Sequence, residues 1–228
     1  MVERLPYTQN VVSSNLAGPT ISMNADTFKI HTIFPTAVAT TDNSQFPVKE
    51  HKIIINSEFS VDPKHGYFHV STNKYILDTV PILKKWIQDQ VDRYSKDVLG
   101  SGKLQFTQSW AIRHNNEPQR IFTHSHGNSI ISGSYYIDAS DESEALTFVK
   151  DNSHNGTYLE YEKDFDNKPW LWTETKFRAY TGRLILFPSH LMHGVLGNQI
   201  INQQRCVLAF NTWFSDPIGS KDALTYLD

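Results

Sequence analysis

The feature that most constrains the fold of this chain is a dense series of short strand-like segments in its C-terminal half. Runs rich in β-branched and aromatic residues alternate there with turn signals, and no helical pattern separates them. The expected strands cover residues 104–112, 120–126, 129–138, 145–149, 173–180, 183–188, 193–196 and 205–214. About eight short strands in about 110 residues are typical of an antiparallel sandwich or barrel. The sequence therefore predicts a mainly β fold.

One helix is predicted ahead of this region. Between Asp78 and Leu99, apolar residues recur at spacings of three and four, with Lys, Gln and Asp on the opposite face. The apolar stripe consists of Val80, Leu83, Ile87, Val91, Tyr94 and Val98. Pro81 is tolerated in the first turn, and Gly100 supplies a left-handed stop. We expect this helix to pack against the sheet.

The rest of the chain is less regular. Residues 1–27 show no periodicity and are expected to form an extended arm, and the polar residues 151–169 are expected to form a lid or a disordered insertion. Further strand-like runs cover residues 28–34, 52–55 and 67–71. No repeat or linker interrupts the sequence, so we expect a single domain over residues 1–228.

Composition excludes several classes of protein. Lys and Arg number 21 against 24 Asp and Glu, and neither sign forms a long block, which argues against nucleic acid and anionic membranes as partners. Neither a membrane span nor a signal peptide is expected. A single cysteine, Cys206, excludes an intramolecular disulfide and is compatible with the cytoplasm. A homo-oligomer stays open, since the N-terminal arm could exchange between subunits.

A pair of histidines lies where one of the predicted strands ends. His124 and His126 are two residues apart, so on a strand their side chains point to the same side. Two imidazoles on one face suit a borderline divalent metal, whereas they would repel each other once protonated. The alternative is a pair of exposed or hydrogen-bonded histidines, because an isolated H-x-H motif is often fortuitous.

A second histidine pair favours the metal hypothesis. His190 and His193 follow an apolar strand that Pro188 interrupts, and His193 begins the returning strand. In an irregular turn only one of the two needs to face the metal, and the other could lie behind it or at the surface. We favour His193 as a third imidazole delivered from another strand.

Arg205 and Tyr136 are candidates for an anion pocket. Arg205 begins the last apolar strand. Because successive side chains of a strand point to opposite faces, Arg205 lies on the face opposite to that of Cys206. An arginine in this position suggests an anionic partner, and its planar fork fits a carboxylate. Tyr136 could add a hydroxyl to the same pocket. The alternatives are an arginine that reaches solvent or a structural acid, and a tyrosine with any other hydrogen-bond partner.

In order and spacing, these residues resemble a known family. The segments that carry the resemblance are 124–126, 132–136, 187–195 and Arg205. They look like the 2-oxoglutarate- and Fe(II)-dependent oxygenases of marine bacteria and their phages. The resemblance implies a double-stranded β-helix, a cupin-like jelly roll with one or more supporting α-helices, with its core over residues 103–214. It also implies the cytoplasm as the location, which is the host cytoplasm for a phage protein.

The resemblance further implies a role for each site residue. His124 and His193 would bind Fe(II), and Arg205 with Tyr136 would hold the distal carboxylate of the co-substrate 2-oxoglutarate. Such an oxidoreductase would use dioxygen, convert 2-oxoglutarate to succinate and carbon dioxide, and hydroxylate a substrate that the sequence does not identify.

The third metal ligand departs from the broader superfamily, which has H-x-D. This chain has His126 at that position, and a three-histidine site lacks the negative charge of the carboxylate. We take His126 as the ligand of an H-x-H variant. If it is not a ligand, Asn128 or Asp138 could approach the iron, or the metal could keep a water.

Two other classes use the same scaffold. The spacing from Gly182 through Pro188 to His193 resembles the second motif of cupins, which would make this a metal-binding protein or enzyme without 2-oxoglutarate. The glutamate expected after the H-x-H pair is missing, and Arg205 has no role in that scheme. The other class is a jelly-roll binding protein with incidental histidines, which would bind no metal.

Overall fold

The computed structural model describes residues 35–61, 68–100, 102–114, 120–140, 143, 145–150, 172–197, 205–219 and 222–225. The chain divides into two compact units, Met1–Thr36 and Ala37–Asp228, and every element below belongs to the second. Three expectations concern the arm 1–27, the strand 28–34 and the insertion 151–169, and these lie outside the described residues. The single domain over 1–228 stays a prediction.

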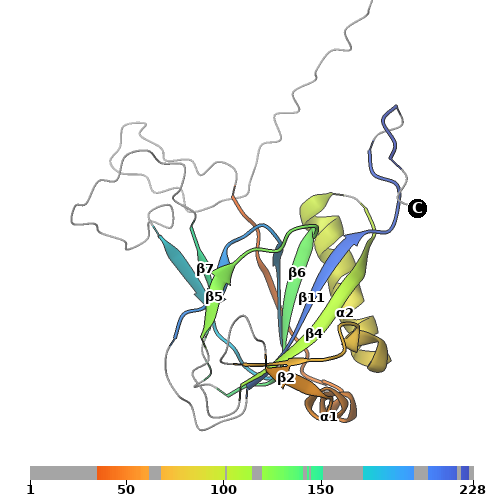
Figure 1. Cartoon of the computed structure of the whole chain (residues 1–228). Coiled ribbons are helices and arrows are strands. Elements are labelled where there is room, and N and C mark those ends of the chain that lie inside the picture. The colour runs from red at the N-terminus through yellow and green to blue at the C-terminus, as the bar shows by residue number, and fades with distance from the viewer. Residues whose placement is uncertain are drawn as a thin grey trace, which may run out of the picture. The chain divides into compact units, whose positions relative to one another are not determined.

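The described elements of the second unit are built around two antiparallel sheets (Figure 1). The larger sheet has seven strands in the order β1 (Ala39–Asp42), β9 (Arg183–Pro188), β6 (Ile131–Asp138), β11 (Arg205–Phe214), β4 (Leu104–His114), β3 (His69–Ser71) and β2 (Phe59–Val61). The smaller sheet has four, in the order β5 (Ile121–His124), β10 (His193–Val195), β7 (Leu146–Val149) and β8 (Glu174–Phe177). This is the mainly β, double-stranded β-helix fold that the sequence predicted, and the eight strands expected from residue 104 onward are confirmed with small shifts at their ends.

Helices cover one face of the larger sheet. The helix α2 (Pro81–Tyr94) follows a short 3₁₀ turn, η1 (Ile76–Thr79), and ends in a π-helical turn, η2 (Ser95–Leu99). Figure 1 shows α2 behind β6, β11 and β4. The buried side chains of α2 join those of the sheet in one hydrophobic core, which includes Leu83, Ile87, Val91, Leu208 and Phe210. The predicted packing of helix on sheet is therefore confirmed.

Within this helix, one member of the predicted stripe is exposed. Val98 keeps 44% of its surface accessible, whereas Val80, Leu83, Ile87, Val91 and Tyr94 are buried. The prediction for Val98 was wrong because the turn η2 is a π-helix, whose wider turn rotates the following residues away from the core stripe. Gly100 ends the helix with a φ of 79°, the left-handed stop expected from the sequence.

The predicted strand at 52–55 is also wrong, because these residues form the end of the helix α1 (Val48–Ile55). Its buried residues are Glu50, His51 and Ile54, a helical spacing that a short run of isoleucines does not reveal. The carboxylate of Glu50 accepts hydrogen bonds from the backbone N–H groups of Ile82, at 3.0 Å, and Leu83, at 2.7 Å. Glu50 thus caps the N-terminus of α2, which ties the two helices together.

A β-bulge interrupts the alternation of side chains along β4. The pairing of β4 with β11 shifts between Asn211 and Thr212, so that one extra residue of β4 stands unpaired. Leu104 and Phe106 pack in the helix-side core, whereas Trp110 and Ile112 line a cavity on the other side of the sheet. In a regular strand these four residues would share one face, but the bulge reverses the facing of every residue beyond it.

None of the described helices is long and apolar enough to cross a membrane.

The cavity lies between the two sheets. It is lined by residues from β4, β6 and β11 on one side and from β5, β7 and β10 on the other. The layout therefore places the chemistry-bearing residues of both sheets in one interior space.

Candidate metal centre and anion pocket

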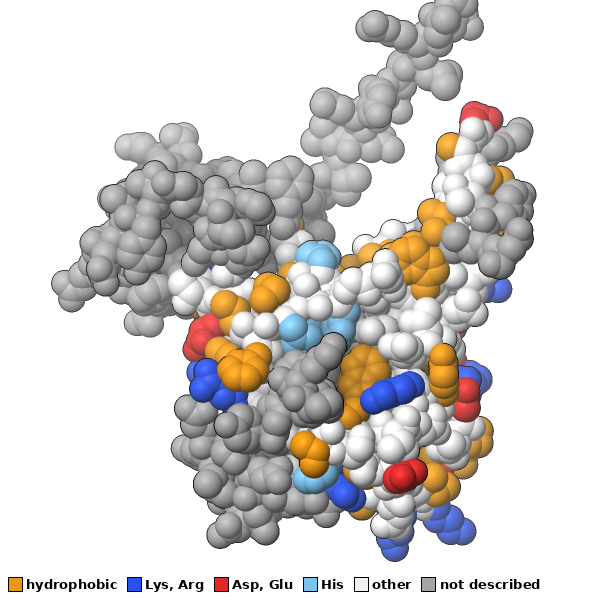
Figure 2. All heavy atoms as spheres, viewed as in Figure 1, with side chains coloured by type: hydrophobic (Ala, Val, Ile, Leu, Met, Phe, Trp, Pro, Cys, Tyr) orange, Lys and Arg blue, Asp and Glu red, His pale blue; other side chains and the backbone are white. Residues whose placement is uncertain are grey.

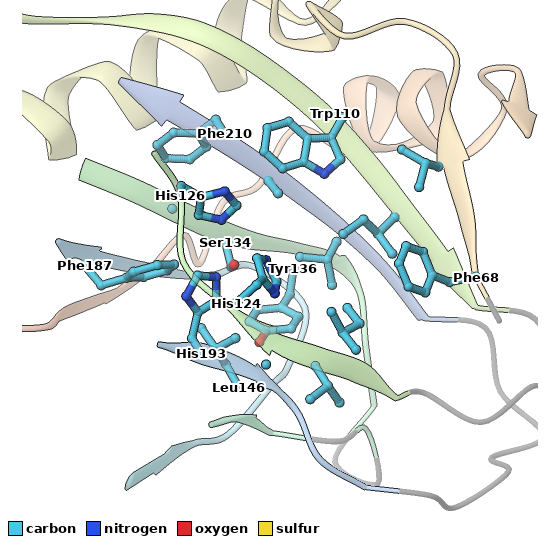
Figure 3. A pocket seen from close by; sticks show the side chains of 18 of the residues that line it. Phe68, Trp110, His124, His126, Ser134, Tyr136, Leu146, Phe187, His193 and Phe210 are labelled. Atoms are coloured by element: carbon cyan, nitrogen blue, oxygen red, sulfur yellow. The ribbon is translucent and has the colours of Figure 1, made fainter. Parts of the chain in front are cut away.

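Three histidines converge at one end of the smaller sheet. His124 ends β5, His126 follows two residues later, and His193 begins β10 directly opposite His124. One ligand nitrogen from each residue can be chosen so that all three lie within 4.8 Å of one another. Figure 3 shows the three imidazoles turned toward the same space. His193 is buried, whereas His124 and His126 are accessible from the cavity mouth.

Backbone carbonyls fix the orientation of two of these rings. The Nδ1 atom of His124 lies 2.8 Å from the carbonyl oxygen of Phe122, and the Nδ1 atom of His193 lies 2.7 Å from that of Leu191. Because a carbonyl can only accept a hydrogen bond, each Nδ1 carries the proton and each Nε2 keeps a free lone pair. Such outer hydrogen bonds are the usual way in which proteins orient metal-binding histidines.

Burial lowers the pKa of two of the three histidines, His126 and His193. Desolvation, assisted by the positive charge that His124 would carry, lowers the pKa of His126 to about 4. The pKa of His193 is also lowered to about 4, chiefly by desolvation, although its hydrogen bond to Leu191 opposes the shift. Only a neutral imidazole has the lone pair that a metal requires, so these rings are in the ligand form at neutral pH.

A network of serine hydroxyls lies behind the histidine cluster and is connected to it through Ser189. The sequence did not predict this network. The backbone N–H of His126 donates to the carbonyl oxygen of Ser189, at 2.8 Å. The hydroxyl of Ser189 lies 2.7 Å from that of Ser129 and accepts from that of Ser132 at 2.8 Å. Ser132 also lies 2.8 Å from the side-chain oxygen of Asn211. The run Ser132-Gly133-Ser134 within β6 was the available signal.

Arg205 and Tyr136 lie on neighbouring strands in the same cavity. Arg205 is 2% exposed and Tyr136 is fully buried, and the guanidinium carbon lies 5.4 Å from the centre of the tyrosine ring. Among the described residues, the Nε and Nη1 atoms of Arg205 and the hydroxyl of Tyr136 have no hydrogen-bond partner. Burial raises the pKa of Tyr136, and the charge of Arg205 partly opposes that shift. A buried cation with unsatisfied donors requires an anion in the cavity.

The cavity that joins the two clusters has a volume of about 520 Å³ and mostly apolar walls. Figure 3 shows Trp110 and Phe210 on one side of the histidines, Phe187 on another, and Phe68 at the far end. A further buried polar residue, His114, lies opposite Arg205 in the pairing of β4 with β11. Neither ring nitrogen of His114 has a hydrogen-bond partner within the described part of the chain, and nothing in the sequence signalled this residue.

The structure thus brings the predicted site residues into one cavity. His124, His126, His193, Arg205 and Tyr136 all line it. His190, the other member of its pair, is exposed. Among the described residues, no carboxylate joins the three histidines as a possible ligand.

The two alternative third ligands are placed differently. Asn128 lies in the turn after His126 with a positive φ of 52°. Asp138 ends β6 and pairs with Cys206, next to Arg205 in the sequence. Neither residue lines the cavity.

The fold and the two clusters are those of a jelly roll with a candidate metal centre and a candidate anion pocket beside it. Comparison with sequence families narrows the class of protein. Residues 108–211 match the sequence profile of the family described as "Putative 2OG-Fe(II) oxygenase". The matched region contains all five predicted site residues. It confirms the predicted enzyme class, an oxidoreductase of the 2-oxoglutarate- and Fe(II)-dependent oxygenase type, together with its cofactors. No curated protein matches the chain.

Several solved structures have a similar fold. HygX from Streptomyces hygroscopicus, solved with nickel and 2-oxoglutarate bound, is 13% identical over 79% of this chain and 84% of its own, with a TM-score of 0.52. The α-ketoglutarate-dependent epimerase SnoN from nogalamycin biosynthesis is 10% identical over 79% and 77%, with a TM-score of 0.57. A prolyl hydroxylase from Trichoplax adhaerens, in complex with a hypoxia inducible factor peptide, is 12% identical over 78% and 83%, with a TM-score of 0.53. At these identities the likeness shows the fold.

Proposed function

We propose that this chain couples the oxidative decarboxylation of 2-oxoglutarate to the hydroxylation of a substrate carbon. In the balanced reaction, 2-oxoglutarate, dioxygen and a C–H bond give succinate, carbon dioxide and an alcohol. The observation that carries the proposal is the unsatisfied Arg205 and Tyr136 pair, which lies in the same cavity as the three-histidine cluster. Fe(II), when bound, supplies the site at which the keto acid chelates and dioxygen is activated.

The three histidines are proposed as the iron ligands. The Nε2 lone pairs of His124 and His193 and the spacing of all three imidazoles suit a divalent first-row metal. A site of three neutral imidazoles gives the metal no compensating negative charge, unlike the common site of two histidines and one carboxylate. The charge must then come from the dianionic co-substrate, so we expect metal and 2-oxoglutarate to increase each other's affinity.

Arg205 and Tyr136 are proposed to bind the distal carboxylate of 2-oxoglutarate. The guanidinium donates to one side of the carboxylate, and the tyrosine hydroxyl adds a third donor. The apolar walls exclude water from this end of the cavity, which strengthens these charge-assisted hydrogen bonds. Arg205 then fixes the orientation of the keto acid, so that its reactive end points toward the histidines.

Anaerobic titration of the Fe(II)-loaded protein with 2-oxoglutarate tests the proposal. Chelation by the keto acid is expected to give a saturable visible charge-transfer band. A bound metal without this band would favour a cupin-type protein that does not use 2-oxoglutarate. Absence of metal binding would leave a jelly-roll binding protein with incidental histidines.

The role of His126 needs its own variants. His126→Ala is expected to weaken Fe(II) binding strongly, and His126→Asp to preserve or improve it, because the carboxylate adds a negative charge to the site. An unchanged Fe(II) affinity in His126→Ala would remove this residue from the ligand set. The His190→Ala variant is the control, since His190 is exposed and does not line the cavity.

A further inference from the structure

The cavity has a second positively charged residue, which the anion pocket does not use. Among the described residues that line it, the cations are Arg205 and Lys74, and there is no acidic side chain. Lys74 lies in the segment between β3 and η1, and its side chain is exposed. A cavity that offers two cations and no carboxylate favours a second anionic group beyond that of the co-substrate.

Strand register separates the two cations. The carbonyl oxygen of Lys74 accepts a hydrogen bond from the backbone N–H of Ser109 in β4, at 2.8 Å. Arg205 pairs with His114 of the same strand. Five residues of β4 therefore separate their backbones, or about 16 Å along the strand. One molecule of 2-oxoglutarate held at Arg205 and reaching toward the histidines leaves Lys74 without an anion.

Lys74 lies next to the part of the cavity wall that is close to the three histidines. Trp110, the neighbour of Ser109, faces the cavity, and its ring centre lies 6.0 Å from that of His126. Gln108 also lines the cavity here and is exposed. Figure 2 shows histidine side chains reaching the surface near hydrophobic side chains and a Lys or Arg side chain. This part of the wall therefore combines an aromatic surface, an amide and an ammonium group.

The ammonium group of Lys74 has free hydrogen-bonding capacity. Its Nζ donates to the carbonyl oxygen of Ser71 at 3.1 Å, which occupies one of three N–H groups. Within the described part of the chain, no carboxylate forms an ion pair with Lys74. The bond to Ser71 orients the side chain at low cost, and two donors remain for a ligand.

We propose that the substrate is a small organic acid, whose carboxylate binds Lys74 and whose apolar or aromatic body lies against Trp110. This inference rests on the proposed function, because that function assigns Arg205 to 2-oxoglutarate and leaves Lys74 for the substrate. Contact with Trp110 would place the body of the acid beside His126, and therefore beside the metal centre. The carboxylate fixes which carbon of the body is presented to it.

A matched pair of probes tests this proposal. Indole-3-acetate and indole-3-acetamide share the same ring and differ in charge, and their binding to the full chain is measured calorimetrically with Zn(II) and saturating 2-oxoglutarate present. We expect the acid to bind at least about tenfold more tightly than the amide, as one charge-assisted hydrogen bond allows. Lys74→Met should abolish this preference and Lys74→Arg should retain it. Lys52→Met, on the exposed face of α1, is the control and should leave it unchanged.

The remaining outcomes separate this proposal from the function it rests on. Trp110→Ala is expected to weaken the acid and the amide equally. Equal binding of acid and amide to the unchanged protein, or a preference that survives Lys74→Met, would overturn the assignment of Lys74. If the preference for the acid is lost in Arg205→Met but retained in Lys74→Met, the probe binds in the anion pocket. This result would also overturn the assignment of Lys74. A titration with 2-oxoglutarate in the absence of the probe tests the proposed function separately. Failure of 2-oxoglutarate to bind there would contradict that function rather than the assignment of Lys74 alone.

Discussion

His193 and His124 lie directly opposite each other in the antiparallel pair of β10 and β5, with ring centres 4.6 Å apart. This pairing places the two imidazoles on one side of the two strands. The Nδ1 atom of each ring is hydrogen-bonded to a backbone carbonyl oxygen. His126 joins them because its backbone N–H is held by Ser189, on the turn that leads into β10. The convergence of the three histidines is therefore a consequence of strand register and one turn.

The first prediction concerns His193. The His193→Ala variant is expected to lower Fe(II) affinity at least about 100-fold, because it removes a ligand where loss of an outer partner alone costs 10–100-fold. Calorimetric titration with Fe(II) under anaerobic conditions measures the change. His190→Ala is the matched control, since it removes an exposed imidazole three residues earlier. Equal affinities in the two variants would argue against His193 as a ligand.

The second prediction separates the anion pocket from the metal centre. Arg205→Met should leave Fe(II) affinity unchanged and weaken 2-oxoglutarate by about 100-fold or more, because each charge-assisted hydrogen bond contributes about 1.5–3 kcal/mol. Tyr136→Phe should weaken 2-oxoglutarate by a smaller factor. The intensity of the charge-transfer band at increasing 2-oxoglutarate concentration gives the 2-oxoglutarate affinity of each variant.

Arg113→Met is the control for Arg205→Met. Arg113 pairs with Cys206, the neighbour of Arg205, but its guanidinium lies over the ring of Phe59, 4.1 Å from its centre, outside the cavity. Removal of this positive charge should leave 2-oxoglutarate affinity within about twofold, because it makes no contact with the cavity. A comparable loss in both variants would mean that the effect arises from general disturbance of the sheet.

Strand alternation explains how much of the site the sequence could predict. Along β11, strict alternation separates Arg205 and Val207 in the cavity from Cys206 and Leu208 in the helix-side core. Alternation failed on β4 because a single extra residue near Phe106 reverses the facing of Trp110. Whether a strand contains a bulge depends on its pairing with a neighbour, which one sequence does not encode locally.

Other features depended on contacts between segments that are distant in the sequence. Glu50 is buried in α1 because it caps the start of α2, and no local pattern reveals such a partner. The hydroxyl network around Ser189 and the orphaned ring of His114 also require the assembled sheets. The sequence could predict residue types and faces, whereas the supporting contacts of the site appear only in three dimensions.

The third prediction concerns the packing of Phe210 over Gly133, its partner in the pairing of β6 with β11. A Cβ atom at Gly133 would lie 2.2 Å from Cζ of Phe210, so the ring must move if any side chain is added. Gly133→Ala should lower the free energy of unfolding by about 1–3 kcal/mol. Denaturant titration measures it, and Gly127→Ala, where the added methyl meets open space, is the control.

A second substitution identifies the cause of this destabilisation. In the Phe210→Leu background, Gly133→Ala should cost less, because the shorter side chain frees the space that the methyl group needs. Additive effects of the two substitutions would show that the loss arises from the backbone rather than from the ring. Because Phe210 also lines the cavity, Gly133→Ala is expected to weaken substrate binding more than metal binding.

The fourth prediction uses His114, which is fully buried and opposite Arg205. Desolvation, with the positive charge of Arg205, lowers its pKa from the usual 6.5 to about 3. Between these two values the unfolded chain binds a proton that the folded chain does not, so the free energy of unfolding falls as the pH drops from about 6.5 to about 3. The contribution of this one residue is on the order of a few kcal/mol.

Replacement by phenylalanine isolates this effect from the titration of carboxylates. His114→Phe keeps a ring beside Phe68, whose centre lies 5.6 Å from the imidazole, and removes two nitrogens that have no hydrogen-bond partner among the described residues. The variant should be at least as stable as the unchanged protein at pH 7, because an unsatisfied buried polar group costs about 1–3 kcal/mol. Its free energy of unfolding should also fall less between pH 6.5 and pH 4, measured by denaturant titration at each pH. An identical pH slope would mean that His114 keeps its ordinary pKa, and strong destabilisation at pH 7 would mean that its ring nitrogens have a partner in solution.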